Sequence, residues 1–323
     1  MTEPSGAAEC ASPARLNGLV LLDKPVGLSS NAALQRVRRL AGRIKAGHCG
    51  SLDPLASGML PICLGEATRL SGELLEGRKA YTLVLQLGER SATGDAEGEI
   101  IERAAVPDLP RARIEAVLRG FLGPQQQVPP MYSALKHDGQ RLYRLARQGV
   151  TVQREARNIC IERLQLLAAE PARLTLAVLC TKGTYVRVLG EDIARALGSC
   201  GRLAGLRRDY VEPFDREAMI SLEQLERLVQ LARPWPLLAP DRALAHLPGL
   251  QLNERAARAL RQGRVLSAAE VLAGVRPTDA GAVCAAAARF RLYDEAGWFL
   301  GLGVSDAGGQ LAVGRLFSAP VMV

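Results

Sequence analysis

The side chains best suited to chemistry lie in one glycine-rich segment, GHCGSLDP at residues 47–54, which carries Asp53. Glycine permits backbone conformations with positive φ and lets a ligand come close to the chain. Pro54 favours an extended conformation at the residue before it. The pattern predicts a carboxylate on a tight, accessible loop, where it acts as a nucleophile or only caps a turn.

Further segments combine aromatic or basic residues with apolar ones: GLVLLDKP at 18–25, RKAY at 78–81, PMYSALK at 130–136, and KGTYVR at 182–187 with LRR at 206–208. Taken alone, each has an ordinary interpretation. Tyr81 at the start of a strand suggests a core residue, Leu206 suggests packing, and Arg187 suggests a surface arginine. His48 suggests a loop residue that only forms hydrogen bonds. The colinear combination is more specific than any single segment.

Together, these segments resemble the active-site motifs of the TruB family of pseudouridine synthases, which modify uridine 55 of transfer RNA. The likeness is strongest over residues 47–69 and runs in order from about residue 18 to 235. The C-terminal part is loosely similar to the small PUA-like RNA-binding domain that these enzymes carry. Cys49 stands where the family often has threonine, and a thiol is a weaker hydrogen-bond partner than a hydroxyl.

The resemblance implies a base-flipping reaction on one uridine. The N1–C1′ bond breaks, the uracil turns, and C5 joins C1′. Since nothing is oxidised or hydrolysed overall, we expect no cofactor and no metal. Asp53 is then the nucleophile, and Arg187 is expected to pair with it through a bidentate fork, which favours an ionised carboxylate in a closed pocket.

The same resemblance assigns contacts to the substrate. Tyr81 is expected to stack on the uracil and to help remove the C5 proton, while Leu206 covers the other face of the base. His48 is expected to fill the space that the flipped uridine leaves, which offsets part of an unstacking cost of roughly a few kcal/mol. Tyr185 and Lys24 complete the expected substrate contacts, Lys24 as a phosphate contact.

Residues 124–153 combine basic side chains with two tyrosines and little core. We interpret this stretch as an exposed insertion that grips the T-arm of the tRNA and becomes ordered on binding, as RNA-binding segments do. Lys136, Arg141, Tyr143 and Arg147 are its candidate RNA contacts. Each of them alone suggests only a solvated side chain.

The net charge of +8 and the pI of about 9.4 suit a polyanionic partner, or else a solvated basic surface. No stretch has the roughly 18 to 20 apolar residues of a membrane helix, and the first sixteen residues lack the pattern of a signal peptide. We therefore expect a cytoplasmic protein, and a monomer because no motif demands an oligomer. Seven cysteines and three histidines lack CxxC or HxxxH spacing, so we expect neither a disulfide framework nor a metal site.

Periodicity predicts a mixture of strands and helices without strict βαβ alternation, which indicates an α+β fold. Strands are expected at 18–22, 81–87, 163–169 and 174–180, helices at 31–41, 111–121, 185–197 and 253–262, and hairpin turns at 294–297 and 305–309. The resemblance implies a pseudouridine-synthase fold, a mixed, largely antiparallel sheet flanked by helices. The expected division is a disordered tail at 1–16, a catalytic domain at 17–246 and a small β-rich PUA-like domain at 247–323.

Two other functions remain compatible with parts of this pattern. One is a tRNA-binding or tRNA-folding module without essential catalysis, which would be indifferent to Asp53→Asn. The other is a glycoside or nucleoside hydrolase, which also works at C1′ but usually needs a second carboxylate as general acid. No such partner acid is evident in the motifs, and free uracil as product would favour this alternative.

Overall fold

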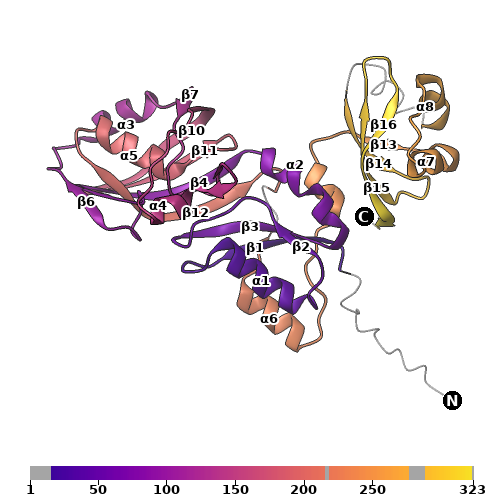
Figure 1. Ribbon diagram of the computed structural model, residues 1–323, viewed down its shortest axis with the longest axis horizontal. Helices are drawn as coiled ribbons and strands as arrows, with labels where there is room; N and C mark the ends of the chain where they lie inside the picture. Colours follow the sequence, from indigo (N-terminus) through magenta and orange to yellow (C-terminus); the bar gives the residue numbers. More distant parts are fainter. Residues whose placement is uncertain (1–15, 215–217, 276–287, 322–323) are drawn as a thin grey trace.

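The computed structural model describes residues 16–214, 218–275 and 288–321. The tail expected at 1–16 lies outside these residues except for Leu16. Within these ranges the chain forms a larger unit built on a mixed sheet and a smaller C-terminal unit built on a second sheet (Figure 1). None of the helices in the same ranges has the length and apolar character needed to cross a bilayer.

In the described residues, the larger unit has an eight-stranded sheet in the order β1-β3-β12-β4-β11-β10-β7, with β2 paired to β3. Its strands are β1 (Gly18–Lys24), β2 (Ala46–His48), β3 (Ala56–Leu64), β4 (Lys79–Leu87), β7 (Gly123–Gln127), β10 (Arg157–Glu170), β11 (Arg173–Cys180) and β12 (Gly201–Val211). β12 runs parallel to β3, whereas the other neighbours are antiparallel. The predicted mixed, largely antiparallel sheet is confirmed.

Helices flank both halves of this sheet: α1 (Ser30–Leu40), η2 (Gly65–Leu70), α2 (Ser71–Glu76), α3 (Arg111–Arg119), α5 (Val186–Ala196), α6 (Leu222–Gln230) and η3 (Pro240–Leu244). α1 and α6 pack together over the β1–β3 half and enclose one apolar core. α3 and α5 enclose a second core with β4, β10 and β11 (Figure 1). Tyr81 and Leu206 pack against both cores, so the two halves of the sheet meet at these side chains.

Two short hairpins project from the larger unit. β5 (Glu89–Ser91) and β6 (Ile100–Arg103) frame a turn, and β8 (Lys136–His137) and β9 (Gln140–Arg141) precede α4 (Leu142–Arg147). The insertion expected at 124–153 starts too early, because residues 124–127 belong to β7 and pair with β10 at the edge of the sheet. Their run of glutamines has no apolar alternation, and an edge strand with one open side does not require one.

The C-terminal unit contains β13 (Gly249–Gln251), α7 (Glu254–Arg261), α8 (Ala268–Gly274), β14 (Arg289–Tyr293), β15 (Phe299–Ser305) and β16 (Leu311–Val321). In the described residues, its strands form a four-stranded sheet in the order β13-β14-β15-β16. The predicted helix and both hairpins are confirmed, and the Asn253 side chain caps α7 by accepting from the Ala256 N–H. Phe299, Leu302 and Phe317 share an apolar core with β1, β3, η2 and α2, so the unit docks against the larger one.

Candidate active site

The Asp53 loop, residues 49–55, connects β2 to β3 and is tied at both ends. The Cys49 N–H donates to the Pro61 carbonyl at 2.9 Å. The Ser30 hydroxyl, at the start of α1, donates to the Leu52 carbonyl at 2.9 Å and accepts from the Leu52 N–H at 2.7 Å. These bonds fix the backbone next to the carboxylate, whose side chain stays 44% exposed. The sequence pattern therefore does form a tight loop with an accessible carboxylate.

Arg187 lies in the first turn of α5 and contacts this carboxylate. Its Nε lies 2.9 Å from Oδ2 of Asp53. Nη1 donates to the Thr93 carbonyl at 2.6 Å, and Nη2 donates to the Tyr132 carbonyl at 2.7 Å. The side chain is 7% exposed. The expected bidentate fork is wrong: one guanidinium joins the Asp53 loop, the β5–β6 turn and the insertion, because two backbone carbonyls occupy its Nη groups.

A second carboxylate, Asp95 in the β5–β6 turn, lies on the same guanidinium. Its Oδ2 is 3.8 Å from Nε of Arg187, and its side chain is 5% exposed. Its Oδ1 accepts from the Thr93 hydroxyl at 2.5 Å and from the Glu97 N–H at 3.0 Å. Asp95 has no distinctive signal in the sequence, because an aspartate that accepts from its own turn is common in any protein. Its Oδ1 is thus occupied within the turn, while its Oδ2 faces the Arg187 guanidinium.

Tyr81 and Leu206 stand near the cross-strand position where β4 meets β12. Leu206 pairs with Leu83 of β4 and with Ala56 of β3, two residues before the partner of Tyr81. Both side chains are partly buried. Burial raises the pKa of the Tyr81 phenol, while the Arg208 guanidinium lowers it through its charge and a hydrogen bond. The phenol is therefore protonated at neutral pH.

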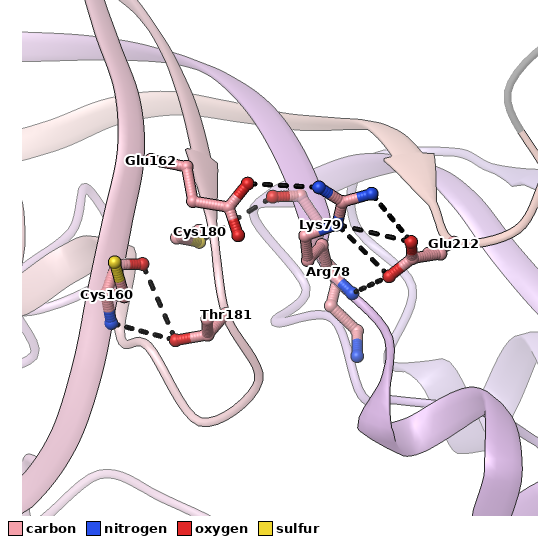
Figure 2. A network of polar contacts seen from close by, with 7 residues as sticks. All are labelled: Arg78, Lys79, Cys160, Glu162, Cys180, Thr181 and Glu212. Atoms are coloured by element: carbon pink, nitrogen blue, oxygen red, sulfur yellow. Dashed lines mark hydrogen bonds and ion pairs between the residues drawn. The ribbon is translucent and has the colours of Figure 1, made fainter. Parts of the chain in front are cut away.

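The start of β4, two residues before Tyr81, is held by a polar network (Figure 2). The Arg78 guanidinium bridges Glu212, at 2.7 Å from Nη2, and Glu162, at 3.1 Å from Nη1. The Arg78 N–H also donates to Glu212 at 3.0 Å. Next to it, the Lys79 ammonium donates to the Leu75 carbonyl at 2.8 Å at the end of α2. These contacts tie the start of β4 to β10, to Glu212 directly after β12, and to α2.

His48 and Tyr185 border the same region. His48 ends β2, and burial, followed by the charge of Arg208, lowers the pKa of its imidazole, which is thus neutral at neutral pH. Its buried Nδ1 has no hydrogen-bond partner among the described residues. Tyr185 caps α5, exchanges backbone bonds of 2.8 and 3.2 Å with the Gln127 side chain, and has a pKa raised by burial.

Lys24 does not occupy the position expected of a phosphate contact. The residue is fully buried at the end of β1. Its ammonium donates to the Pro25 carbonyl at 2.8 Å and to the Leu28 carbonyl at 2.6 Å. Burial lowers its pKa to about 8, although the nearby Asp53 charge acts in the opposite direction. The Lys24 ammonium therefore stabilises the turn that follows β1 by donating to two of its carbonyls.

The four insertion residues lie apart from this cluster, on β8, β9 and α4. Lys136, Arg141 and Arg147 are exposed, and Tyr143 is half-buried. The Arg147 guanidinium stands 5.8 Å from the centre of the Tyr143 ring. Six of the expected residues thus lie in one region: His48, Asp53, Tyr81, Tyr185, Arg187 and Leu206. Lys24 instead binds the turn after β1, and the four insertion residues lie outside this region. Within the described ranges, no group of three or more His, Cys, Asp or Glu side chains is arranged to hold a metal ion.

Comparisons with known proteins show the family to which this chain is similar. The sequence profile described as TruB family pseudouridylate synthase (N terminal domain) matches residues 38–186, and that described as Pseudouridine synthase II TruB, C-terminal matches residues 248–317. The chain is 51% identical over 252 residues to tRNA pseudouridine synthase B of Nitrosococcus oceani, covering 77% of this chain and 82% of that protein. It is 47% identical over 305 residues to the protein of the same name from Stutzerimonas stutzeri, covering 93% and 95%.

The chain belongs to the TruB family of pseudouridine synthases.

Two solved structures show the same fold at lower identity. The protein in a structure titled "Crystal Structure of a Cbf5-Nop10-Gar1 Complex" superposes with a TM-score of 0.69 and 23% identity, over 93% of this chain and 84% of that chain. A structure titled "Structure of H/ACA RNP bound to a substrate RNA containing 2'-deoxyuridine" gives a TM-score of 0.69 at 21% identity, over 94% and 85%. The predicted pseudouridine-synthase fold with its C-terminal domain is confirmed.

Proposed function

We propose that this TruB-family protein isomerises uridine 55 in the T-loop of transfer RNA to pseudouridine, with Asp53 as nucleophile. The observation that carries the proposal is the ion pair of 2.9 Å between the half-exposed Asp53 carboxylate and the buried Arg187 guanidinium. The relatives named tRNA pseudouridine synthase B support the substrate class. The larger unit, 17–246, then acts as the catalytic domain, and 247–323 as the PUA-like domain.

Asp53 starts the reaction as an anion whose free oxygen meets the sugar or the base of the flipped nucleotide. The N1–C1′ bond breaks, the uracil rotates, and C5 bonds to C1′. N1 gains a proton and C5 loses one, so the product is an isomer of the substrate. Arg187 keeps the carboxylate in place through the attack, because its two Nη groups stay bound to backbone carbonyls.

Tyr81 and Leu206 are the proposed walls for the uracil. Both lie where the two cores of the sheet meet, close enough along β4 and β12 to cover one planar ring. A protonated phenol suits stacking on an uncharged base. The same protonation disfavours Tyr81 as the first acceptor of the C5 proton, a role that would require prior loss of its own proton.

His48 and Tyr185 are proposed to contact the nucleotides around the target. A neutral imidazole can enter a base stack without the desolvation cost of a charge. Tyr185 precedes Arg187 by two residues and is the N-cap of the same helix, α5. This position supports a contact with the flipped base.

The direct test is to incubate the protein with an unmodified T-arm hairpin and to map pseudouridine chemically. We expect one modified position, the T-loop uridine, and none when that uridine is replaced by cytidine. Free uracil in the supernatant would instead indicate hydrolysis at C1′. Unchanged RNA that is nevertheless bound would indicate a binding or folding module.

The insertion is proposed to hold the T-arm through its exposed cations. Changing Lys136 and Arg141 together to glutamine should weaken hairpin binding and reduce the slope of log K against log salt by roughly 2, about one unit for each lost phosphate contact. Arg173→Gln is the matched control, since this exposed arginine lies at the far end of β11 from the site. Equal slopes for the double variant and the parent would contradict an RNA contact.

A further inference from the structure

A buried arginine lies under the Asp53 loop, in the motif LRR, without any role in the chemistry above. Arg208 of β12 is 1% exposed. Its Nε donates to the Met59 carbonyl at 2.8 Å, and its Nη2 donates to the Gly50 carbonyl at 3.0 Å. On the opposite side, β12 pairs Arg208 with Tyr81 of β4. The Arg208 guanidinium also hydrogen-bonds the Tyr81 phenol and lowers the pKa of that phenol, so one side chain contacts the loop, β3 and the tyrosine.

Two glycines of the active-site segment lie against position 208, one against its side chain and one against its backbone. Gly50 has a φ of +88°, and a Cβ there would stand 3.4 Å from Nη1 of Arg208. Gly58 has a φ of +98°, and a Cβ there would stand 2.2 Å from the Arg208 carbonyl oxygen, a distance that no side chain tolerates. Gly58 thus lets the β12 backbone pack closely on β3, and Gly50 places the Asp53 loop directly against the Arg208 guanidinium.

The guanidinium of Arg208 is buried with hydrogen bonds to backbone carbonyls. Among the described residues it makes no ion pair, and a buried cation without one is costly. Its charge acts on the site instead. Burial has the largest effect on the pKa of His48 and of Lys79, and the Arg208 charge has the second largest; both lower these pKa values. The Arg208 charge also lowers the pKa of Tyr81, against the larger effect of burial. An apolar side chain would pack here without the free-energy cost of burying a charge. We therefore attribute a role at the site to the guanidinium.

We propose that Arg208 is a positioning residue that fixes the Asp53 loop and Tyr81 to one another, so that nucleophile and stacking ring face the same flipped base. The proposal rests on the proposed function. Arg208 touches neither the carboxylate of Asp53 nor the expected position of the uracil. It acts through the Gly50 carbonyl on one side and through the Tyr81 hydroxyl on the other.

Two variants separate geometry from charge. Arg208→Lys keeps a cation but cannot hold both carbonyls with one short ammonium. Arg208→Met keeps the length and removes charge and donors. The matched control is Arg207→Met on the same strand, since Arg207 is partly exposed and binds both oxygens of Asp23 at 3.0 Å.

Single-turnover rates and hairpin affinities are then measured for each variant. We expect both Arg208 variants to lower the rate on the order of 100-fold, the cost of about 1 Å of misplacement, while the dissociation constant changes less than about threefold. Arg207→Met should stay within about twofold of the parent in both. A loss of affinity that matches the loss of rate, or an equal loss in Arg207→Met, would overturn the proposal in favour of general strand stability.

Two readouts do not depend on turnover. Hydrogen exchange of the amides in 49–53 should become faster in both Arg208 variants and stay unchanged in Arg207→Met. In NMR titrations of the three histidines, the pKa of His48 should rise in Arg208→Met, where a like charge is lost, and stay lower in Arg208→Lys. Unchanged exchange and an unchanged His48 pKa would overturn the positioning role. An inactive parent chain would contradict only the proposed function, because these two readouts remain measurable.

Discussion

Arg187 satisfies three acceptors with one planar group, and this sharing defines its role at the residue scale. Nε binds a carboxylate of the Asp53 loop, and the Nη groups bind carbonyls from two other segments. A lysine ammonium can reach one or two of these acceptors but not three in this planar arrangement. The side chain therefore joins the attacking group to the elements that surround it.

Arg187→Lys should lower the rate of pseudouridine formation by at least about 100-fold, because Asp53 loses its fixed partner while the cation stays. Arg195→Lys, on an exposed position of the same helix, should have the parent rate. Single-turnover kinetics with the T-arm hairpin measures both. An Arg187→Lys rate close to the parent would show that the guanidinium geometry is dispensable.

At the scale of elements, the junction of α2 and β4 links the docking surface of the C-terminal unit to Tyr81. The Lys79 ammonium is almost fully buried and donates to the Leu75 and Gly77 carbonyls at the end of α2. Burial, followed by the charge of Arg208, lowers its pKa from 10.5 to about 8. Cys180, Glu76 and Glu212 act in the opposite direction with smaller effect.

This junction gives a pH prediction. Between pH 8 and 10.5 the unfolded chain binds the Lys79 proton more tightly than the folded one, so the free energy of unfolding rises with pH, by about 1 kcal/mol per pH unit near pH 9 for this lysine alone. Lys79→Met should remove that part of the slope. Urea unfolding of parent and variant at pH 8, 9 and 10 provides the difference. Parallel stability curves would contradict the depressed pKa.

Sequence patterns predicted the elements with clear periodicity, such as α1 and the β10–β11 hairpin, because each buries one regular face. They missed β3 and β12. β3 contains Gly58 and Pro61, which read as loop residues, and β12 contains consecutive charged residues at 207–209. Both strands are central, and tertiary pairing overrides local preference there. Family likeness supplied the site residues, whereas Asp95 and Arg208 became visible only when folding brought them to Arg187 and to the Asp53 loop.

At the scale of the whole molecule, the two units share a core. Phe299, Leu302 and Phe317 of the C-terminal unit pack with residues of β1, β3, η2 and α2. Polar contacts reinforce this interface: Arg289 pairs with Glu73 of α2, and the Ser318 N–H donates to Glu66 at 2.9 Å. Removing one unit would expose apolar surface on the other, so the two should unfold together.

The two tryptophans make this prediction measurable, since Trp235 packs against a core of the larger unit and Trp298 lies in the C-terminal unit. Trp298→Phe leaves only the tryptophan of the larger unit, and Trp235→Phe leaves only that of the C-terminal unit. In each variant, the urea midpoint from fluorescence should equal the midpoint from circular dichroism, which follows the whole chain. Phe299→Ala should lower the free energy of unfolding by about 3 to 5 kcal/mol. The urea midpoints reported by the two tryptophans should therefore fall together. Two separated transitions in the parent would show that the units are energetically independent.

The central claim is that the Asp53 carboxylate is the nucleophile. The most direct measurement is single-turnover conversion of the unmodified T-arm hairpin by Asp53→Asn, with binding of the same hairpin measured in parallel. We expect Asp53→Asn to be slower by at least about 10⁴-fold, with an affinity for the hairpin within about threefold of the parent. Pseudouridine formed at an undiminished rate by Asp53→Asn would contradict this claim.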